Sequence, residues 1–164
     1  MRVAIFGKSF TKDSRPYVQA LYDELKETGA DIRIYKRLNR FLEDHCSLDL
    51  NLDVFSSHEE LVEYNPNCLI TLGGDGTILD AVTLVRDSGI PILGVNTGRL
   101  GFLSNVSKEQ LSEAVQAVAQ GNYKVEERNV VELNTSAINI DLNFALNEIT
   151  VSRKDTTAMV SVHV

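Results

Sequence analysis

The sequence predicts an α/β protein, with a parallel sheet flanked by helices, followed by the first strands of a β-rich domain. As far as Gly121, short continuous apolar segments alternate with segments whose apolar residues stand at helical spacing. From Tyr123 onward, apolar residues tend to stand at every second position, as in strands. We therefore expect an α/β domain over residues 1–121 and the start of an incomplete β-rich domain over residues 122–164.

The first part of the chain predicts two strands and one well-marked helix. The apolar run 1–7 predicts a strand, and apolar residues at helical spacing between Ser14, a capping residue, and Gly29, a terminator, predict a helix. The alternating segment 31–35 predicts a second strand. Residues 39–46 are short and mixed, and they support only a loop or a single helical turn.

A strand–helix–strand unit follows. Ser57 and Glu60 form a capping box for a short helix that ends at Tyr64. The continuously apolar stretches 67–72 and 90–95 then predict two buried strands, with a helix from about Thr77 to Ser88 between them. Such a crossover is nearly always right-handed, so its first loop opens at the carboxyl edge of the sheet.

The last helix and the tail are clearly separated. Ser107 and Gln110 form a capping box, and an apolar stripe continues to Gly121. The alternating segments that follow predict three strands, over 123–133, 138–151 and 156–164.

Composition excludes several classes of protein. The 164 residues are 43% hydrophobic and 24% charged, which is typical of a globular protein. The net charge of −7 disfavours binding to the negatively charged backbone of nucleic acid. No apolar stretch is long enough to cross a membrane and no signal peptide is evident, so we expect a cytoplasmic protein. Cys46 and Cys68 lack metal-ligand spacing, and we interpret Cys68 as a core residue.

The most informative stretch is GGDGT, residues 73–77. Glycines between a strand and a helix let backbone N–H groups approach a phosphate, and the helix N-terminus adds partial positive charge. Asp75 would repel a bare phosphate, so its presence indicates a metal or a hydroxyl whose proton it accepts beside the phosphate being transferred. The alternative is a tight turn in which Asp75 caps the helix.

Two better-known phosphate motifs are absent. The dinucleotide fingerprint fails because Leu79 stands at its third glycine, and the segment Gly7-Lys8-Ser9 lacks the leading glycine of a P-loop, having Arg2 there. Lys8 most simply belongs to a polar loop, although it is placed to reach a ligand at the sheet edge.

A second loop, residues 96–103, emerges at the same edge as GGDGT, so the two loops should face each other. Asn96 and Thr97 offer hydrogen bonds to hydroxyls or phosphates, and Phe102 offers a flat surface to an aromatic ring. The alternative for Phe102 is a plain core residue.

A third candidate lies in the tail. Asn147 and Glu148 interrupt an apolar run with an amide and a carboxylate, which need polar partners. A surface turn and a site that reads amide edges and sugar hydroxyls fit these two residues equally well.

The three stretches GGDGT, VNTGRLGFL and ALNEI, in this order, resemble the NAD kinase family. That family phosphorylates the 2′-hydroxyl of the adenosine ribose of NAD to make NADP. GGDGT alone is less specific, because lipid kinases carry it and phosphofructokinases have a close variant.

The resemblance implies a phosphofructokinase-like α/β domain and assigns roles to individual residues. Asp75 would be the general base, Gly74 and Gly76 would line the phosphate path, and Asn147 and Glu148 would hold NAD. Asn96 is a further candidate for nucleotide binding, and Phe102 would pack against the dinucleotide. We expect NAD as substrate with ATP or another phosphate donor, and a divalent cation such as Mg²⁺ carried with ATP. We also expect no metal bound by the protein's own residues, and a dimer or tetramer of the full-length protein.

One departure from the family pattern stands out. Family members continue into a β-rich domain with a second glycine-rich motif, whereas this chain ends at Val164. The sequence is therefore either a truncated form or a family-like domain that works without its second half, and we expect these 164 residues alone to be inactive. A lipid kinase and a non-catalytic nucleotide-binding or oligomerisation module remain the alternatives.

Overall fold

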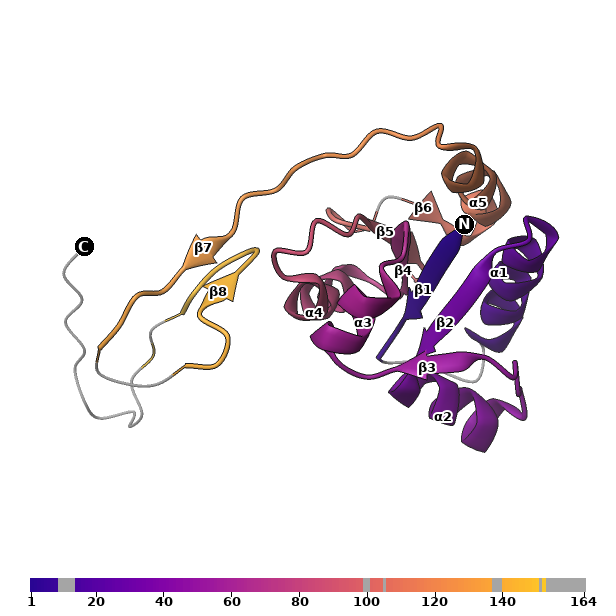
Figure 1. Ribbon diagram of the computed structural model, residues 1–164, viewed down its shortest axis with the longest axis horizontal. Helices are drawn as coiled ribbons and strands as arrows, with labels where there is room; N and C mark the ends of the chain where they lie inside the picture. Colours follow the sequence, from indigo (N-terminus) through magenta and orange to yellow (C-terminus); the bar gives the residue numbers. More distant parts are fainter. Residues whose placement is uncertain (9–13, 99–100, 105, 137–139, 151, 153–164) are drawn as a thin grey trace. The chain divides into compact units, whose positions relative to one another are not determined.

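A six-stranded parallel sheet forms the centre of the computed structural model, which describes residues 1–8, 14–98, 101–104, 106–136, 140–150 and 152. The strands lie in the order β3-β2-β1-β4-β5-β6 (Figure 1). Their bounds are β1 Arg2–Phe6, β2 Asp31–Tyr35, β3 Asp53–Phe55, β4 Cys68–Leu72, β5 Ile92–Asn96 and β6 Val106–Ser107. The order reverses between β1 and β4, and open α/β folds bind their ligands beside such a reversal.

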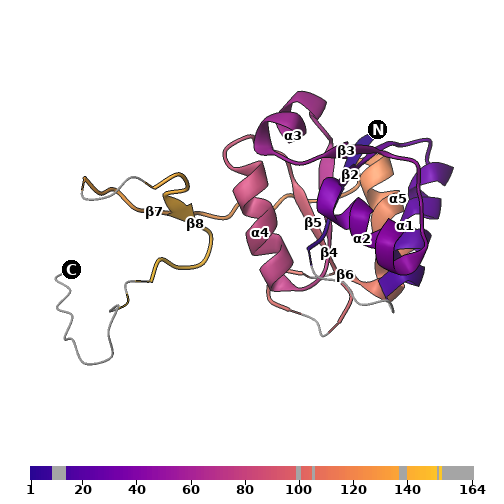
Figure 2. The same ribbon diagram turned by 90° about the horizontal axis from the view of Figure 1, so that it is seen from below.

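Helices cover both faces of this sheet, as Figures 1 and 2 show. Their bounds are α1 Arg15–Glu27, α2 Lys36–Cys46, α3 His58–Tyr64, α4 Asp75–Val85 and α5 Leu111–Gln120, the last preceded by a 3₁₀ turn at Lys108–Gln110. On one face α1, α2 and α5 pack against alternate residues of β1 such as Val3 and Ile5. On the other face α3 and α4 pack against Ala4 and Phe6. The parallel sheet flanked by helices is thus confirmed.

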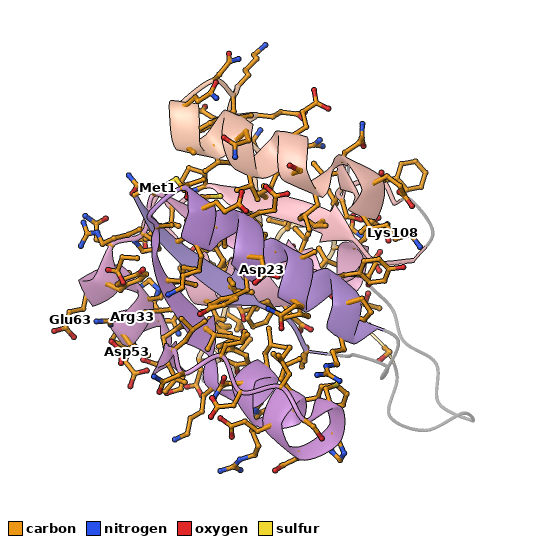
Figure 3. All side chains as sticks on the ribbon, turned by 90° about the vertical axis from the view of Figure 1, so that its right-hand side faces the viewer. Met1, Asp23, Arg33, Asp53, Glu63 and Lys108 are labelled. Atoms are coloured by element: carbon orange, nitrogen blue, oxygen red, sulfur yellow. The ribbon has the colours of Figure 1, made fainter. Side chains whose placement is uncertain are left out.

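Side-chain contacts also join helices that are far apart in the sequence. The Nζ of Lys108, in the turn before α5, lies 2.8 Å from the hydroxyl of Tyr17 in α1. Figure 3 looks onto this side of the sheet, with Asp23 of α1 and Lys108 labelled. At the amino end of the sheet, the buried hydroxyl of Tyr64 donates to the carbonyl of Asp31 across 2.7 Å.

The sequence-based interpretation of residues 39–46 as a loop or a single turn is wrong. Residues Lys36–Cys46 form the eleven-residue helix α2, whose buried positions Leu38, Leu42 and Cys46 recur every four residues. The helix follows β2 directly, and no side chain caps its first turn. Without a capping residue the beginning of the helix leaves no sequence signal, so its apolar period is not recognised from Lys36 onward.

Two short strands were not predicted. Residues Asp53–Phe55 form β3 and Val106–Ser107 form β6, which pair with β2 and β5 at the two edges of the sheet. Three- and two-residue strands are too short for an apolar alternation to be recognised. In addition, α4 begins at Asp75 and ends at Val85, so the glycine-rich loop is shorter than the sequence predicts.

The chain divides into two units, Met1–Glu126 and Glu127–Val164. In the second unit Val131–Glu132 (β7) and Phe144–Ala145 (β8) form an antiparallel pair, which begins the β-rich part. Among the described residues of the predicted strands 123–133 and 138–151, only these two pairs of residues are extended, so the predictions are wrong in extent there. A two-stranded ribbon buries too little apolar surface to hold extended pairing. The predicted strand 156–164 lies outside the described residues.

Candidate active site at the switch point of the sheet

The glycine-rich loop leads from β4 directly into α4. The N–H of Gly73 donates to the carbonyl of Val95 across 3.0 Å, and the carbonyl of Gly74 accepts from Thr77 N across 2.9 Å. Gly73 has φ of 151°, and a Cβ there would run into the Thr77 side chain, so only glycine fits. Gly74 and Gly76 are exposed. The first turn of α4 therefore faces solvent at the carboxyl edge of the sheet.

The Asp75 side chain does not cap its helix. It reaches across to the loop that follows β5, and its Oδ2 accepts from Phe102 N at 2.8 Å. Its Oδ1 accepts from Leu103 N and from Ser104 N, both at 3.0 Å, and from Ser104 Oγ at 3.1 Å. The two loops therefore meet at the sheet edge as the sequence predicts, and Asp75 joins them.

These donors change the acidity of Asp75. The backbone N–H of Ser104 first, then those of Phe102 and Leu103, lower the pKa of the Asp75 carboxyl below its ordinary value. Each hydrogen bond stabilises the ionised form more than the neutral form. At neutral pH Asp75 is therefore a carboxylate that offers only acceptor sites.

The side chain of Asn96 is hydrogen-bonded to two residues of the loop that follows β5. It is only 3% exposed, its Oδ1 accepts from Gly98 N at 2.7 Å, and its Nδ2 donates to Ser104 Oγ at 3.0 Å. The side chain predicted as a ligand contact is thus engaged within the protein, and direct contact with a nucleotide stays a prediction. The sequence does not indicate Ser104 as a site residue, because a serine next to an apolar residue carries no motif of its own.

Two glycines let the second loop lie close to its neighbours. A Cβ on Gly101 would collide with the Asp75 carboxylate, and a Cβ on Gly94 would collide with Ile78 and crowd the Ser104 backbone. Both positions require glycine for close approach, whatever their backbone conformation. The contact between Asp75 and the loop is therefore built into the packing of β5 and α4.

Phe102 is presented to solvent. Its side chain is 94% exposed although its N–H is bound to Asp75. The alternative interpretation of Phe102 as a core residue is therefore wrong. A large apolar ring so exposed beside a polar loop offers a surface for an aromatic ligand.

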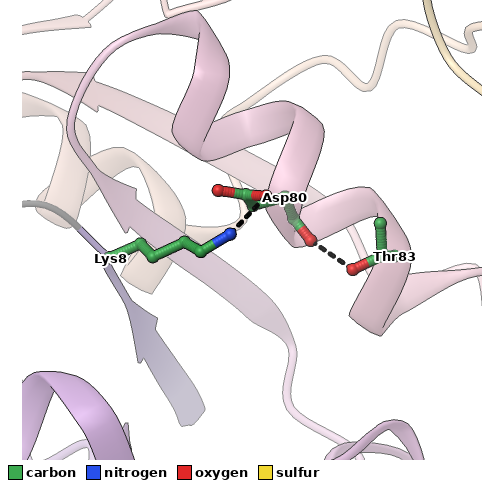
Figure 4. Close-up of polar contacts among 3 residues, drawn as sticks. All are labelled: Lys8, Asp80 and Thr83. Atoms are coloured by element: carbon green, nitrogen blue, oxygen red, sulfur yellow. Dashed lines mark hydrogen bonds and ion pairs between the residues drawn. The ribbon is translucent and has the colours of Figure 1, made fainter. Parts of the chain in front are cut away.

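Lys8 extends from the end of β1 on the other side of the strand-order reversal. Its Nζ lies 2.9 Å from Asp80 Oδ1 in α4, and both side chains are partly exposed (Figure 4). The carbonyl of Asp80 also accepts from Thr83 Oγ1 at 2.7 Å. Lys8 therefore brings a positive charge to the carboxyl edge of the sheet, where an aspartate holds it.

Asn147 and Glu148 lie just after β8 in the second unit, and both are exposed. Exposure leaves their polar groups accessible, but it agrees equally with a surface turn. Their part in a nucleotide site stays a prediction.

Among the residues that the structure describes, no three His, Cys, Asp or Glu side chains gather in a way that could hold a metal ion. Within the same residues, no helix is long and apolar enough to cross a membrane. Cys68 is buried, and burial raises the pKa of its thiol to about 12, as befits a core residue.

The fold and the site together define a class: a doubly wound α/β protein with a glycine-rich loop and an acidic residue at its switch point. Comparison with known proteins specifies the family. Residues 3–123 match the family described as the ATP-NAD kinase N-terminal domain, and the chain belongs to this NAD kinase family.

Curated relatives agree with this assignment. The chain is 41% identical to the NAD kinase of Flavobacterium psychrophilum and 36% identical to that of Bacteroides fragilis. Each match covers 99% of this chain, but only 56% and 55% of the relatives. The chain therefore spans about half the length of the curated relatives it matches.

A solved structure matches the fold. The crystal structure of a yeast NADH kinase complexed with NADH gives a TM-score of 0.69 at 24% identity. The match covers 89% of this chain and 46% of the yeast chain. At this identity the likeness supports the fold alone.

Proposed function

We propose that the full-length protein phosphorylates the 2′-hydroxyl of the adenosine ribose of NAD and so produces NADP. The observation that carries this proposal is the Asp75 carboxylate, held at the N-terminus of α4 by the loop that also carries the exposed Phe102 ring. The names of the curated relatives support the same reaction.

In this proposal the α4 N-terminus and the exposed glycines 74 and 76 attract the phosphates of the donor. Asp75 accepts the hydrogen bond of the ribose hydroxyl and takes its proton as the hydroxyl attacks the γ-phosphorus. The lowered pKa makes Asp75 a weak base, so its main contribution is to orient the hydroxyl. Proton transfer follows as the attacking oxygen becomes bonded to phosphorus.

Three exposed residues are candidates for contact with NAD. The Phe102 ring would stack on an aromatic ring of NAD, while Asn147 and Glu148 would bind amide and hydroxyl groups. Mg²⁺ would arrive with ATP, because Mg²⁺ is commonly held by substrate phosphates and one or two carboxylates. We further propose a cytoplasmic dimer or tetramer that acts on no nucleic acid.

The decisive experiment incubates the complete gene product with ATP, Mg²⁺ and NAD and measures NADP by an NADP-specific dehydrogenase. A parallel reaction with diacylglycerol in place of NAD tests the lipid-kinase alternative, and NAD binding by calorimetry tests a non-catalytic module. NADP formed only when both ATP and NAD are present supports the proposal. Binding of NAD without any NADP would overturn it.

A further inference from the structure

Three hydrogen bonds in series lead from a backbone amide to Asp75. Gly98 N donates to Asn96 Oδ1 at 2.7 Å, and Asn96 Nδ2 donates to Ser104 Oγ at 3.0 Å. Ser104 Oγ then lies 3.1 Å from Asp75 Oδ1. We call this series the Asn96–Ser104 relay.

The direction of the relay is fixed at its first member. A backbone N–H is only a donor, so the amide oxygen of Asn96 must face Gly98 and its NH₂ group must face Ser104. A hydroxyl has a single proton, and Ser104 Oγ already accepts from Asn96. Its proton is therefore directed to Asp75.

Burial makes this arrangement costly to change. Asn96 is 3% exposed and Ser104 is fully buried, so an unpaired polar group at either position would lose hydrogen bonds without gaining water. A surface serine would turn its hydroxyl freely. The Ser104 hydroxyl has two fixed partners.

The consequence for Asp75 is an asymmetry between its two oxygens. Oδ1 accepts from Leu103 N, Ser104 N and Ser104 Oγ, whereas Oδ2 accepts from Phe102 N. A carboxylate oxygen has about two lone-pair sites, so within the described residues Oδ1 is saturated and Oδ2 retains an acceptor site. The two oxygens therefore differ in what they are able to accept.

We propose that Ser104 and Asn96 are positioning residues that hold the Asp75 carboxylate so that Oδ2 receives the substrate hydroxyl. In the transfer, the hydroxyl oxygen bonds to the γ-phosphorus and its proton moves to Asp75 Oδ2. The bond from the γ-phosphorus to the bridging oxygen breaks, and the nucleoside diphosphate leaves with that electron pair. This inference rests on the proposed function and adds to it the residues that select the reacting oxygen.

The test uses the full-length protein and two substitutions that alter the relay differently. Ser104→Ala removes the donated proton. Asn96→Asp keeps the acceptor for Gly98 but replaces the donor to Ser104 by an acceptor, which turns the Ser104 hydroxyl away from Asp75. Each should lower kcat by about tenfold to a hundredfold with little change in KM, because the attacking hydroxyl is no longer held in line.

The double variant and one control separate positioning from stability. In the Ser104→Ala background, Asn96→Asp has no hydroxyl left to turn, so its effect on kcat should be much smaller. The control Tyr64→Phe removes a different hydrogen bond of a buried side chain, from the Tyr64 hydroxyl to the Asp31 carbonyl at the amino end of the sheet. It should lower the melting temperature without changing kcat.

A second readout does not depend on activity. Titration of the Asp75 carboxyl by ¹³C NMR should give a higher pKa in Ser104→Ala and in Asn96→Asp than in the unsubstituted protein, and no change in Tyr64→Phe. If the unsubstituted protein makes no NADP, the proposed function fails and the NMR titration still decides the relay. Unchanged kcat and unchanged Asp75 pKa in both relay variants, with only lower melting temperatures, would overturn it.

Discussion

The N–H of Phe102 donates to Asp75 Oδ2 across 2.8 Å, while the ring of the same phenylalanine is 94% exposed. One hydrogen bond therefore joins the carboxylate to the backbone of the residue that carries the exposed ring. We expect a ligand that stacks on this ring to lie near Asp75.

The first prediction concerns the space around Asp75. Gly101→Ala places a Cβ against the carboxylate and should lower the free energy of unfolding by about 1–3 kcal/mol through overpacking. Gly98→Ala is the matched control, because among the described residues its Cβ meets Asn96 Oδ1 at 3.8 Å, an ordinary contact. Urea unfolding of both variants measures the difference, and equal losses would contradict the close approach.

The second prediction concerns the chemistry of Asp75. Asp75→Asn in the full-length protein should lower the turnover of NAD by about 10²- to 10⁴-fold. The amide has one acceptor oxygen instead of two, so it cannot both keep the hydrogen bonds of the loop and orient the hydroxyl, and it cannot take the hydroxyl proton. The buried core of the sheet should stay intact, which circular dichroism checks. Turnover close to that of the unsubstituted protein would remove the assignment of Asp75 as the proton acceptor.

The third prediction concerns pH. The hydrogen bonds from the loop lower the pKa of folded Asp75 below its value in the unfolded chain. The stabilisation that they provide is therefore present above the unfolded pKa of about 3.9 and is lost as pH falls through the folded pKa. Unfolding by urea should show Asp75→Asn less stable than the unsubstituted protein near neutral pH. This gap should narrow in strong acid, and a gap independent of pH would contradict the prediction.

The fourth prediction separates binding from stability at Phe102. Because the ring is exposed, Phe102→Ala should change the free energy of unfolding by less than about 0.5 kcal/mol. It should weaken NAD binding by about 0.5–1.5 kcal/mol through lost stacking, measurable by calorimetry. Phe55→Ala gives the opposite control, since Phe55 is fully buried and its loss should destabilise the fold by about 3–5 kcal/mol.

The fifth prediction concerns the second unit. If Asn147 and Glu148 bind NAD, replacing either by Ala in the full-length protein should weaken NAD binding by about 1–3 kcal/mol, because partner groups are left unpaired. Both residues are exposed, so the melting temperature should hardly change. Unchanged affinity together with a lowered melting temperature would identify them as part of a structural turn.

The sequence by itself determined the class of fold and the location of the site. Three local patterns carry this prediction: the apolar run Cys68–Leu72, the glycines after it and the apolar stripe of the helix that follows. Local patterns can be recognised from the sequence without a structure. The same patterns predicted that the loops after β4 and β5 meet, because parallel strands bring their carboxyl ends to one edge. Helix α2 is not predicted from the sequence, because it begins directly after a strand and has no capping residue at its N-terminus.

Only the tertiary structure decided what the individual side chains do. Phe102 points to solvent, Asn96 turns inward, and Asp75 is bound by the loop instead of capping its helix. Ser104 is identified as a site residue by its hydrogen bonds to Asn96 and Asp75. The hydrogen bonds that bring Asp75, Asn96 and Ser104 together join residues that are 8 to 29 positions apart in the chain. Such long-range contacts form only when the strands pack side by side, and no local periodicity records them.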